Sequence, residues 1–267
     1  MAERSIKIAD LAVTFVEPSM TQRKVIIGYL NELGLSQVEW FSEGQAALKD
    51  MYQFQPDLVV SAMHLPDMSG TELIQYMRED TILEQIPFML ISSEHSDYYL
   101  EPIRQAGVVA ILSKPFDLKD LKKALYSTLE FIEPDNSALA DIELDQLMVL
   151  VVDDSDTARK HLCRVLEGLG IENIVQAVNG KDALKCMAQR FFDLIVTDYN
   201  MPEMDGRELT RYVRENGTDK SIPILMVTSE KNRSRLAGVK QAGVSALCDK
   251  PFEPAKVKSL IKKILSE

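Results

Sequence analysis

The chain contains one pattern of residues twice, and its second occurrence is Asp193-Leu-Ile-Val-Thr-Asp-Tyr-Asn-Met-Pro-Glu-Met-Asp-Gly206. Its counterpart is Asp57-Leu-Val-Val-Ser-Ala-Met-His-Leu-Pro-Asp-Met-Ser-Gly70, which lies 136 residues earlier and aligns with it without a gap. The same offset places Lys114-Pro-Phe116 on Lys250-Pro-Phe252. The chain therefore contains two copies of one ancestral domain.

The two copies differ at the carboxylates that could carry chemistry. Three positions hold an acid in the second copy and a different residue in the first: Asp198 faces Ala62, Asp154 faces Pro18 and Asp205 faces Ser69. A functional site built on carboxylates is therefore expected in the second copy.

The length of 267 residues suits two domains of ordinary size. The repeat predicts a first domain over 1–131, a linker over 132–143 and a second domain over 144–267. No apolar run approaches the roughly 18 residues needed to cross a bilayer, and no secretory leader is recognisable, so a cytoplasmic protein without membrane insertion is expected. The cysteines lack metal-ligand spacing and are expected to be reduced: Cys163, Cys186 and Cys248.

The net charge of −11 is carried almost entirely by the first copy. Residues 1–135 hold 11 basic and 21 acidic side chains, whereas residues 136–267 hold 19 and 20. Nucleic-acid binding requires a concentrated basic face, so this balance argues against it. The asymmetry is better suited to steering protein partners, or one half of the chain toward the other.

The pattern of apolar residues predicts the same fold class for both copies. The continuous apolar run 147–152 suits a strand that is covered on both faces of a parallel sheet. The helical pattern that follows it ends at Gly170. Each copy is thus predicted to be a doubly wound α/β domain of the flavodoxin-like type, with five β-α units and a parallel five-stranded sheet.

The predicted elements follow one order in both copies. In the second copy the strands are 147–152, 174–177, 194–197, 224–227 and 246–247, and the helices are 156–169, 181–189, 206–215, 233–242 and 254–265. In the first copy the strands are 12–16, 38–41, 58–61, 88–91 and 110–112, and the helices are 19–33, 45–52, 70–78, 98–105 and 118–130. The connector 133–143 is expected to start a linking helix.

Polar side chains follow the predicted strands of the second copy. Ligands of doubly wound sheets bind at the carboxyl ends of the strands, and these ends carry Asp153, Asp154, Asp198, Thr228 and Lys250. Clustered carboxylates repel one another unless a cation neutralises them, and hard oxygen ligands suit Mg²⁺. One aspartate could then attack phosphorus, while the hydroxyl and the ammonium group bind phosphoryl oxygens.

With these motifs in view, the second copy resembles a response-regulator receiver domain of the CheY-like type. The resemblance rests on Val151-Val-Asp-Asp-Ser155, on the segment from Asp198 to Gly206, on Val227-Thr-Ser229 and on Lys250-Pro-Phe252. It covers the whole length of the copy. It implies a phosphoprotein of two-component signal transduction.

The resemblance also implies the role of each carboxylate. Asp198 would be the phosphoacceptor. Asp153 and Asp154 would bind Mg²⁺ together with Asp198 and the main-chain carbonyl of Asn200.

Two further side chains complete the site that the resemblance implies. Thr228 would be the switch hydroxyl, and Lys250 would contact the acyl phosphate, with a cis peptide bond before Pro251. The chain departs from the family at Leu247, where receivers usually carry an aromatic switch residue. The usual rotation of a ring is therefore not expected here.

The first copy resembles a receiver that has lost its chemistry. Glu17 alone remains of the acid pair because Pro18 replaces the second carboxylate, and Ala62 has no side chain that can accept a phosphoryl group. Lys114 and Ser92 would then be left without a task. This copy is interpreted as a pseudo-receiver used for binding or for positioning the second domain.

The sequence is therefore interpreted as a two-receiver response regulator with no output segment after Glu267. A sensor histidine kinase or a phosphotransfer protein would donate the phosphoryl group to Asp198 in a phosphorelay. The protein is expected to be no enzyme beyond catalysing its own phosphorylation and dephosphorylation. Output would pass through contact with a protein target, and contact between the two receivers is a further candidate.

Two other classes of function stay open at this point. Asp154-Ser-Asp156-Thr157 loosely resembles the motif of haloacid-dehalogenase-like phosphatases, although that interpretation leaves the Asp198 segment unexplained. The chain could also be an interaction scaffold whose second copy is never phosphorylated.

Two local features have structural interpretations. Asp156 is expected to cap the helix that follows it. Basic residues gather near the last two helices and suit either a solvated face or a docking face for an acidic partner: Lys231, Arg233, Arg235, Lys240, Lys256, Lys258, Lys262 and Lys263.

Overall fold

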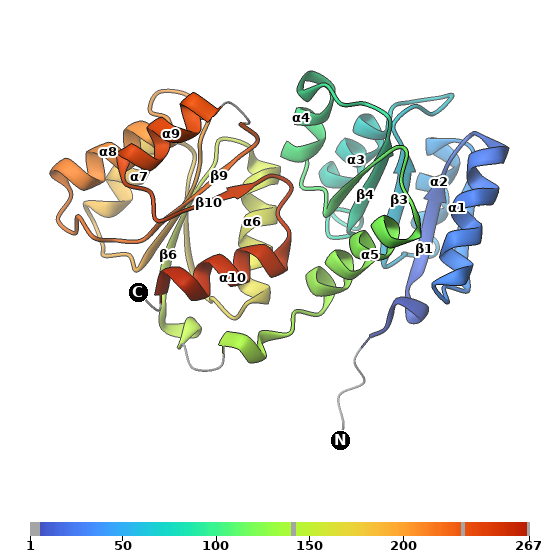
Figure 1. The fold of residues 1–267 in the computed structure, drawn as a ribbon, viewed down its shortest axis with the longest axis horizontal. Coiled ribbons are helices and arrows are strands. Elements are labelled where there is room, and N and C mark those ends of the chain that lie inside the picture. The colour runs from blue at the N-terminus through green and yellow to red at the C-terminus, as the bar shows by residue number, and fades with distance from the viewer. Residues whose placement is uncertain (1–5, 140–142, 231–232, 266–267) are drawn as a thin grey trace. The chain divides into compact units, whose positions relative to one another are not determined.

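The computed structural model describes residues 6–139, 143–230 and 233–265. The chain divides into two compact units, Met1–Glu133 and Pro134–Glu267. Each unit is a parallel five-stranded sheet with helices on both faces (Figure 1). The predicted doubly wound α/β fold of both copies is therefore confirmed.

In the first unit the strand order is β2-β1-β3-β4-β5. The strands are β1 (Ala12–Val16), β2 (Gln37–Phe41), β3 (Leu58–Ala62), β4 (Phe88–Ser92) and β5 (Ala110–Ser113). The helices are α1 (Met20–Glu32), α2 (Gly44–Met51), α3 (Gly70–Glu79), α4 (Asp97–Gln105) and α5 (Leu118–Ile132), preceded by the 3-10 turn η1 (Ile8–Asp10).

The second unit repeats this topology, with strand order β7-β6-β8-β9-β10. The strands are β6 (Met148–Val152), β7 (Asn173–Ala177), β8 (Leu194–Asp198), β9 (Ile224–Thr228) and β10 (Ala246–Asp249). The helices are α6 (Asp156–Gly168), α7 (Gly180–Met187), α8 (Gly206–Asn216), α9 (Arg233–Ala242) and α10 (Pro254–Leu265). This order places the topological switch point between β6 and β8, where doubly wound domains bind their ligands.

Burial explains why the central strands read as continuous apolar runs. Every residue of β3, β4, β8 and β9 is buried, because helices cover both faces of the sheet. The strands β2 and β7, each at one edge of its sheet, are partly exposed and contain both polar and apolar residues.

Two local predictions were wrong. The connector 133–143 does not start a linking helix within its described residues; it contains the 3-10 turn η2 (Asn136–Leu139) and is followed by the 3-10 turn η3 (Leu144–Gln146). The cap of α6 is Ser155, whose hydroxyl accepts the Ala158 N–H, whereas Asp156 is the first helical residue and forms ion pairs with two basic side chains of the same helix. The predicted stop at Gly170 is confirmed by its positive φ of 98°.

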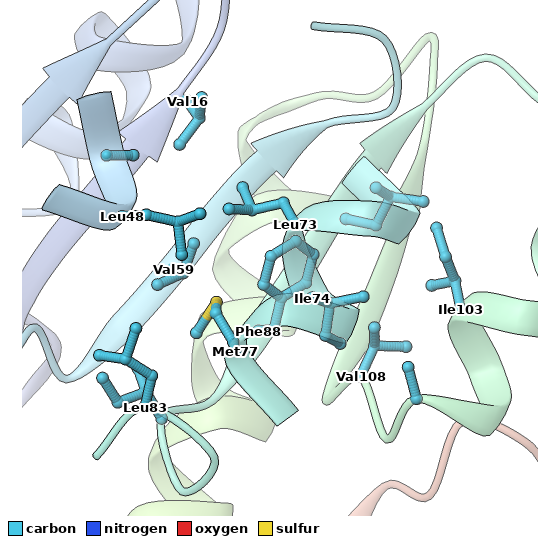
Figure 2. Close-up of a cluster of buried hydrophobic side chains, with 14 of the residues drawn as sticks. Val16, Leu48, Val59, Leu73, Ile74, Met77, Leu83, Phe88, Ile103 and Val108 are labelled. Atoms are coloured by element: carbon cyan, nitrogen blue, oxygen red, sulfur yellow. The ribbon is translucent and has the colours of Figure 1, made fainter. Parts of the chain in front are cut away.

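The core of the first unit is packed on both sides of its sheet. Figure 2 shows one of these clusters, in which Phe88 of β4 lies beside Met77 and Ile74 of α3. All three side chains are fully buried. Burying such side chains contributes about 1.5–3 kcal/mol each, so the first copy keeps a well-packed core although it lacks acids at the positions of Asp154 and Asp198.

Two further expectations concern the state of the cysteines and the absence of membrane-spanning segments. Cys163, Cys186 and Cys248 are free thiols. Cys248 lies within β10, and burial raises its pKa to about 11. None of the helices in the described part of the chain combines the length and the apolar character needed to cross a membrane.

Candidate functional site

The strand ends of the second unit bring the predicted site residues together. Asp153 and Asp154 directly follow β6, Asp198 ends β8, Thr228 ends β9 and Lys250 directly follows β10. Oxygens of the three aspartates lie within 4.8 Å of one another. The residues therefore form one cluster at the switch point of the sheet.

Lys250 connects the two buried acids of this cluster. Its Nζ atom lies 2.9 Å from Oδ2 of Asp153 and 3.0 Å from Oδ1 of Asp198. All three side chains are almost fully buried, whereas Asp154 is exposed. One lysine thus faces two buried carboxylates, which leaves an excess of negative charge that a cation would neutralise.

Burial and charge shift the protonation of these groups in opposite directions. Burial raises the pKa of Asp198 to about 6, although Lys250 opposes the shift. Burial also raises the pKa of Asp153, against the same opposition. Burial alone would lower the pKa of Lys250, but Asp198 and Asp153 outweigh it and raise that pKa, so the lysine remains charged at neutral pH.

Main-chain amides hold the two buried carboxylates in place. The Ser155 N–H donates to Oδ1 of Asp153 at 2.9 Å, and the Asn200 N–H donates to Oδ2 of Asp198 at 3.1 Å. The start of α8 approaches Asp198 so closely that a Cβ on Gly206 would lie 2.1 Å from the Asp198 carbonyl oxygen. A glycine is therefore required at this position. In the sequence, Gly206 stands out only as the last residue of the Asp198 motif.

Asp205 has a structural task rather than a place in the acid cluster. Its side chain accepts the Glu208 N–H at 2.7 Å while the Glu208 carboxylate accepts the Asp205 N–H, which forms a capping box at the start of α8. The aspartate that replaces Ser69 of the first copy is thus explained by helix capping, and Ser69 caps α3 in the same way.

Leu247 occupies the position where receivers usually carry an aromatic switch residue. Thr228 is buried, and its hydroxyl accepts the Glu230 N–H at 2.9 Å. Leu247 is partly buried and packs on a cluster formed by Tyr199, Met226 and Val239. The peptide bond between Lys250 and Pro251 is cis, as the resemblance implies.

The first unit keeps much of this geometry without its chemistry. Glu17 occupies the position of Asp153: it is buried, and its Oε1 accepts the Ser19 N–H at 2.9 Å. Lys114 lies 3.4 Å from Oε2 of Glu17 and donates a hydrogen bond to Gln22. The Ser92 hydroxyl accepts a main-chain N–H at 3.0 Å. The expectation that Lys114 and Ser92 have no functional task stays a prediction, because these polar contacts hold the two side chains in place without supplying a phosphoacceptor.

The acid cluster fits a divalent cation, and the first unit offers no counterpart among its described residues. Three carboxylates that present oxygens within 4.8 Å are the hard ligands that Mg²⁺ prefers. In the first unit the corresponding positions are Glu17, Pro18 and Ala62. A doubly wound domain with an acid cluster, a buried hydroxyl and a buried lysine at its switch point has the architecture of a receiver-type signalling domain.

Comparison with known proteins agrees with this class. Residues 13–126 and 149–262 both match the response regulator receiver domain, so the chain belongs to the receiver-domain family of response regulators and carries two such domains in tandem. It is 40% identical over 118 residues to the chemotaxis protein CheY of Pseudomonas aeruginosa, and this alignment covers 44% of this chain and 95% of that protein. It is 37% identical over 118 residues to CheY-3 of Vibrio cholerae, which covers 44% of this chain and 91% of that protein.

Solved structures with similar folds include two kinds of protein. One is a putative two-component system response regulator/GGDEF domain protein. Its alignment covers 96% of this chain and 98% of that chain, at 24% identity and a TM-score of 0.43. The chemotaxis protein CheY4 of Vibrio cholerae covers 44% of this chain and 98% of its own, at 32% identity and a TM-score of 0.42. From its family and its CheY relatives, the chain is a CheY-like response regulator of two-component signalling.

Proposed function

We propose that the second domain, over 144–267, receives a phosphoryl group on Asp198 with Mg²⁺ held by Asp153, Asp154, Asp198 and the main-chain carbonyl of Asn200. The observation that carries this proposal is the convergence of three carboxylates within 4.8 Å beside the buried Lys250. The phosphoryl group would come from a sensor histidine kinase or a phosphotransfer protein. The protein would act in the cytoplasm, and its signal would pass to a protein target.

The transfer needs a nucleophile and groups that neutralise charge. A carboxylate oxygen of Asp198 forms a bond to phosphorus while the P–N bond of the phosphohistidine breaks; the imidazole nitrogen keeps the electron pair and takes up a proton. Bound Mg²⁺ would supply positive charge for the phosphoryl oxygens. Lys250 lies 3.0 Å from Asp198 and would exchange this contact for a phosphoryl oxygen.

Thr228 would report the modification to the rest of the domain. Its hydroxyl lies at the end of β9 and accepts the Glu230 N–H. If the hydroxyl moves to a phosphoryl oxygen, this hydrogen bond changes, and with it the segment that leads to α9. Lys231, where this segment continues, lies outside the described residues, as do the side chains of Arg233 and Arg235 from the predicted basic face.

The first domain, over 1–131, would serve as a pseudo-receiver for binding or for positioning the second domain, joined to it by the linker 132–143. Ala62 offers no nucleophile, and Lys114 is already paired with Glu17. Receiver domains of response regulators are generally not enzymes, and self-modification is the only chemistry proposed here. A phosphatase is disfavoured because Asp156 is 65% exposed and pairs with Arg159 and Lys160 instead of joining the acid cluster.

Mg²⁺ should bind to the second domain and leave the first unaffected. Titration of the 267-residue protein with MgCl₂, followed by amide chemical shifts, should move the signals around Asp153, Asp198 and Asn200, because the cation neutralises their shared charge. Signals around Glu17 and Ala62 should stay in place.

Two variants separate a specific site from general attraction to acidic surface. Asp153→Asn should abolish the shifts, since it removes a buried ligand of the cluster. Asp156→Asn removes a neighbouring exposed carboxylate and should leave them unchanged. Equal Mg²⁺ affinity in the two domains, or retained affinity in Asp153→Asn, would refute the proposed site.

A further inference from the structure

A recess lined by arginines lies between α8 and α9 of the second unit, two helices that are neighbours in Figure 1. Its volume is about 250 Å³. The lining residues are Arg207, Arg211, Arg214, Glu215, Gly238, Gln241 and Ala242. None of them belongs to the acid cluster around Asp198, so the recess is a separate feature of the domain.

The three arginines do not have the same task. Arg214 supports the fold: its Nε donates to the Gly243 carbonyl at 2.9 Å and its Nη1 donates to the Lys220 carbonyl at 2.9 Å. Arg207 and Arg211 are exposed, and no described carboxylate lies within ion-pair distance of either guanidinium. The recess therefore presents two cations whose charge is not balanced locally by an ion pair.

The first copy of the domain provides an internal comparison. Its Arg78 corresponds to Arg214 and makes the same kind of bonds, from Nε to the Ala106 carbonyl at 3.1 Å and from Nη1 to the Glu84 carbonyl at 3.0 Å. The other two arginines have no counterpart there, because the repeat offset places Thr71 and Gln75 at their positions. The structural arginine is thus shared by both copies, whereas the two exposed arginines belong only to the copy with the acid cluster.

Gly238 gives the recess its shape. A Cβ at this position would lie 3.3 Å from Cζ of Arg207, so the glycine lets the guanidinium rest directly against the backbone of α9. The first copy has Pro102 at the corresponding position of α4. A glycine inside a helix lowers helix stability relative to alanine, and here it leaves room beside a charged group.

We propose that this recess binds the phosphate group of a small phosphorylated molecule. Guanidinium groups match phosphate with paired hydrogen bonds, which makes arginine better suited than lysine to such a site. Arg214 interacts electrostatically with Asp219, which leaves Arg207 and Arg211 as the two cations available to a ligand beside Glu215. A phosphate monoester carries a charge of about −1.5 to −2 at pH 7 and can accept hydrogen bonds from both guanidinium groups at once. The volume of the recess is large enough for a phosphate or a pyrophosphate.

The test is calorimetric titration of the 267-residue protein with inorganic pyrophosphate in EDTA, which keeps metal out of the acid cluster. The unmodified protein should show saturable binding of one ligand. The variant Arg207→Thr/Arg211→Gln installs the residues of the first copy and should bind at least about tenfold more weakly, because charge-assisted hydrogen bonds are lost. Amide shifts caused by pyrophosphate should map to α8 and α9.

A charge-matched control separates this site from general electrostatic attraction. Arg190→Gln/Lys263→Gln removes two exposed basic side chains elsewhere in the domain and should leave the affinity unchanged. Absence of saturable binding by the unmodified protein would overturn the proposal. Equal weakening in both double variants, or unchanged affinity in Arg207→Thr/Arg211→Gln, would overturn it as well. Glutamate or an acidic peptide that binds as tightly as pyrophosphate would show that the recess does not select phosphate.

Discussion

The Asp198→Ala protein should take up no phosphoryl group from acetyl phosphate and Mg²⁺, whereas the unmodified protein should take up one. Asp198 is the only acid at the acceptor position of either copy, because Ala62 stands at that position in the first. Removing a nucleophile lowers the rate of its reaction by at least about a thousandfold, so labelling should fall below detection. Intact-mass measurement over time gives the stoichiometry and the rate directly.

The matched control for this variant is Glu203→Ala. Glu203 lies in the loop between β8 and α8, is 56% exposed and pairs with Lys181 at 3.3 Å. Its removal takes one carboxylate from the same loop without touching the acid cluster, so labelling should proceed at the unmodified rate. If Asp198→Ala were labelled as fast as Glu203→Ala, the phosphoacceptor would lie elsewhere.

In metal-free solution at pH 7, the second domain of the Asp198→Asn protein should be more stable than that of the unmodified protein. At pH 4 the two proteins should have similar stability. Burial raises the pKa of Asp198 to about 6 from its ordinary value of 3.8. Between these values the folded domain holds a proton that the unfolded chain has released, so the free energy of unfolding falls as the pH rises. Asparagine cannot ionise and avoids this loss, which amounts to about 3 kcal/mol.

The chain contains separate reporters for its two domains. All three cysteines lie in the second domain, and Cys248 is fully buried, so its labelling during a urea titration follows the unfolding of that domain. Trp40 is the single tryptophan and lies in the first domain. The urea midpoint reported by its fluorescence should therefore be the same in the unmodified protein and in Asp198→Asn. Added Mg²⁺ should stabilise the unmodified second domain more than the variant. A stability difference that is the same at pH 4 and pH 7 would contradict this account.

Much of the fold could be predicted because the repeat gives two independent sequences for each strand and each helix. The apolar run at 147–152 became the buried strand β6, and the carboxyl ends of parallel strands had to meet at one edge of the sheet. The convergence of Asp153, Asp198 and Lys250 follows from that topology alone. The finer features did not, since a cap depends on local backbone angles: Ser155 caps α6, although Asp156 is an equally suitable residue type.

Some contacts between elements distant in sequence were not predicted. The pairing of Lys114 with Glu17 joins residues 97 positions apart, and the interpretation of the sequence assigned Lys114 no task and named no partner for it. The recess between α8 and α9 depends on Gly238 lying against Arg207, a distance that no pattern in either helix reveals. In both cases the comparison of the two copies is the sequence signal that leads to the feature, once the structure shows which positions face each other.

We expect phosphoryl transfer to occur only in the second domain, and mapping the position of the label on the unmodified protein gives a direct answer. The protein would be phosphorylated with acetyl phosphate and Mg²⁺, digested under conditions that preserve the acyl phosphate, and analysed by peptide mass spectrometry. The account predicts a single labelled peptide, the one that contains Asp198. A labelled peptide from residues 1–131, or a label in the second domain outside Asp198, would contradict it.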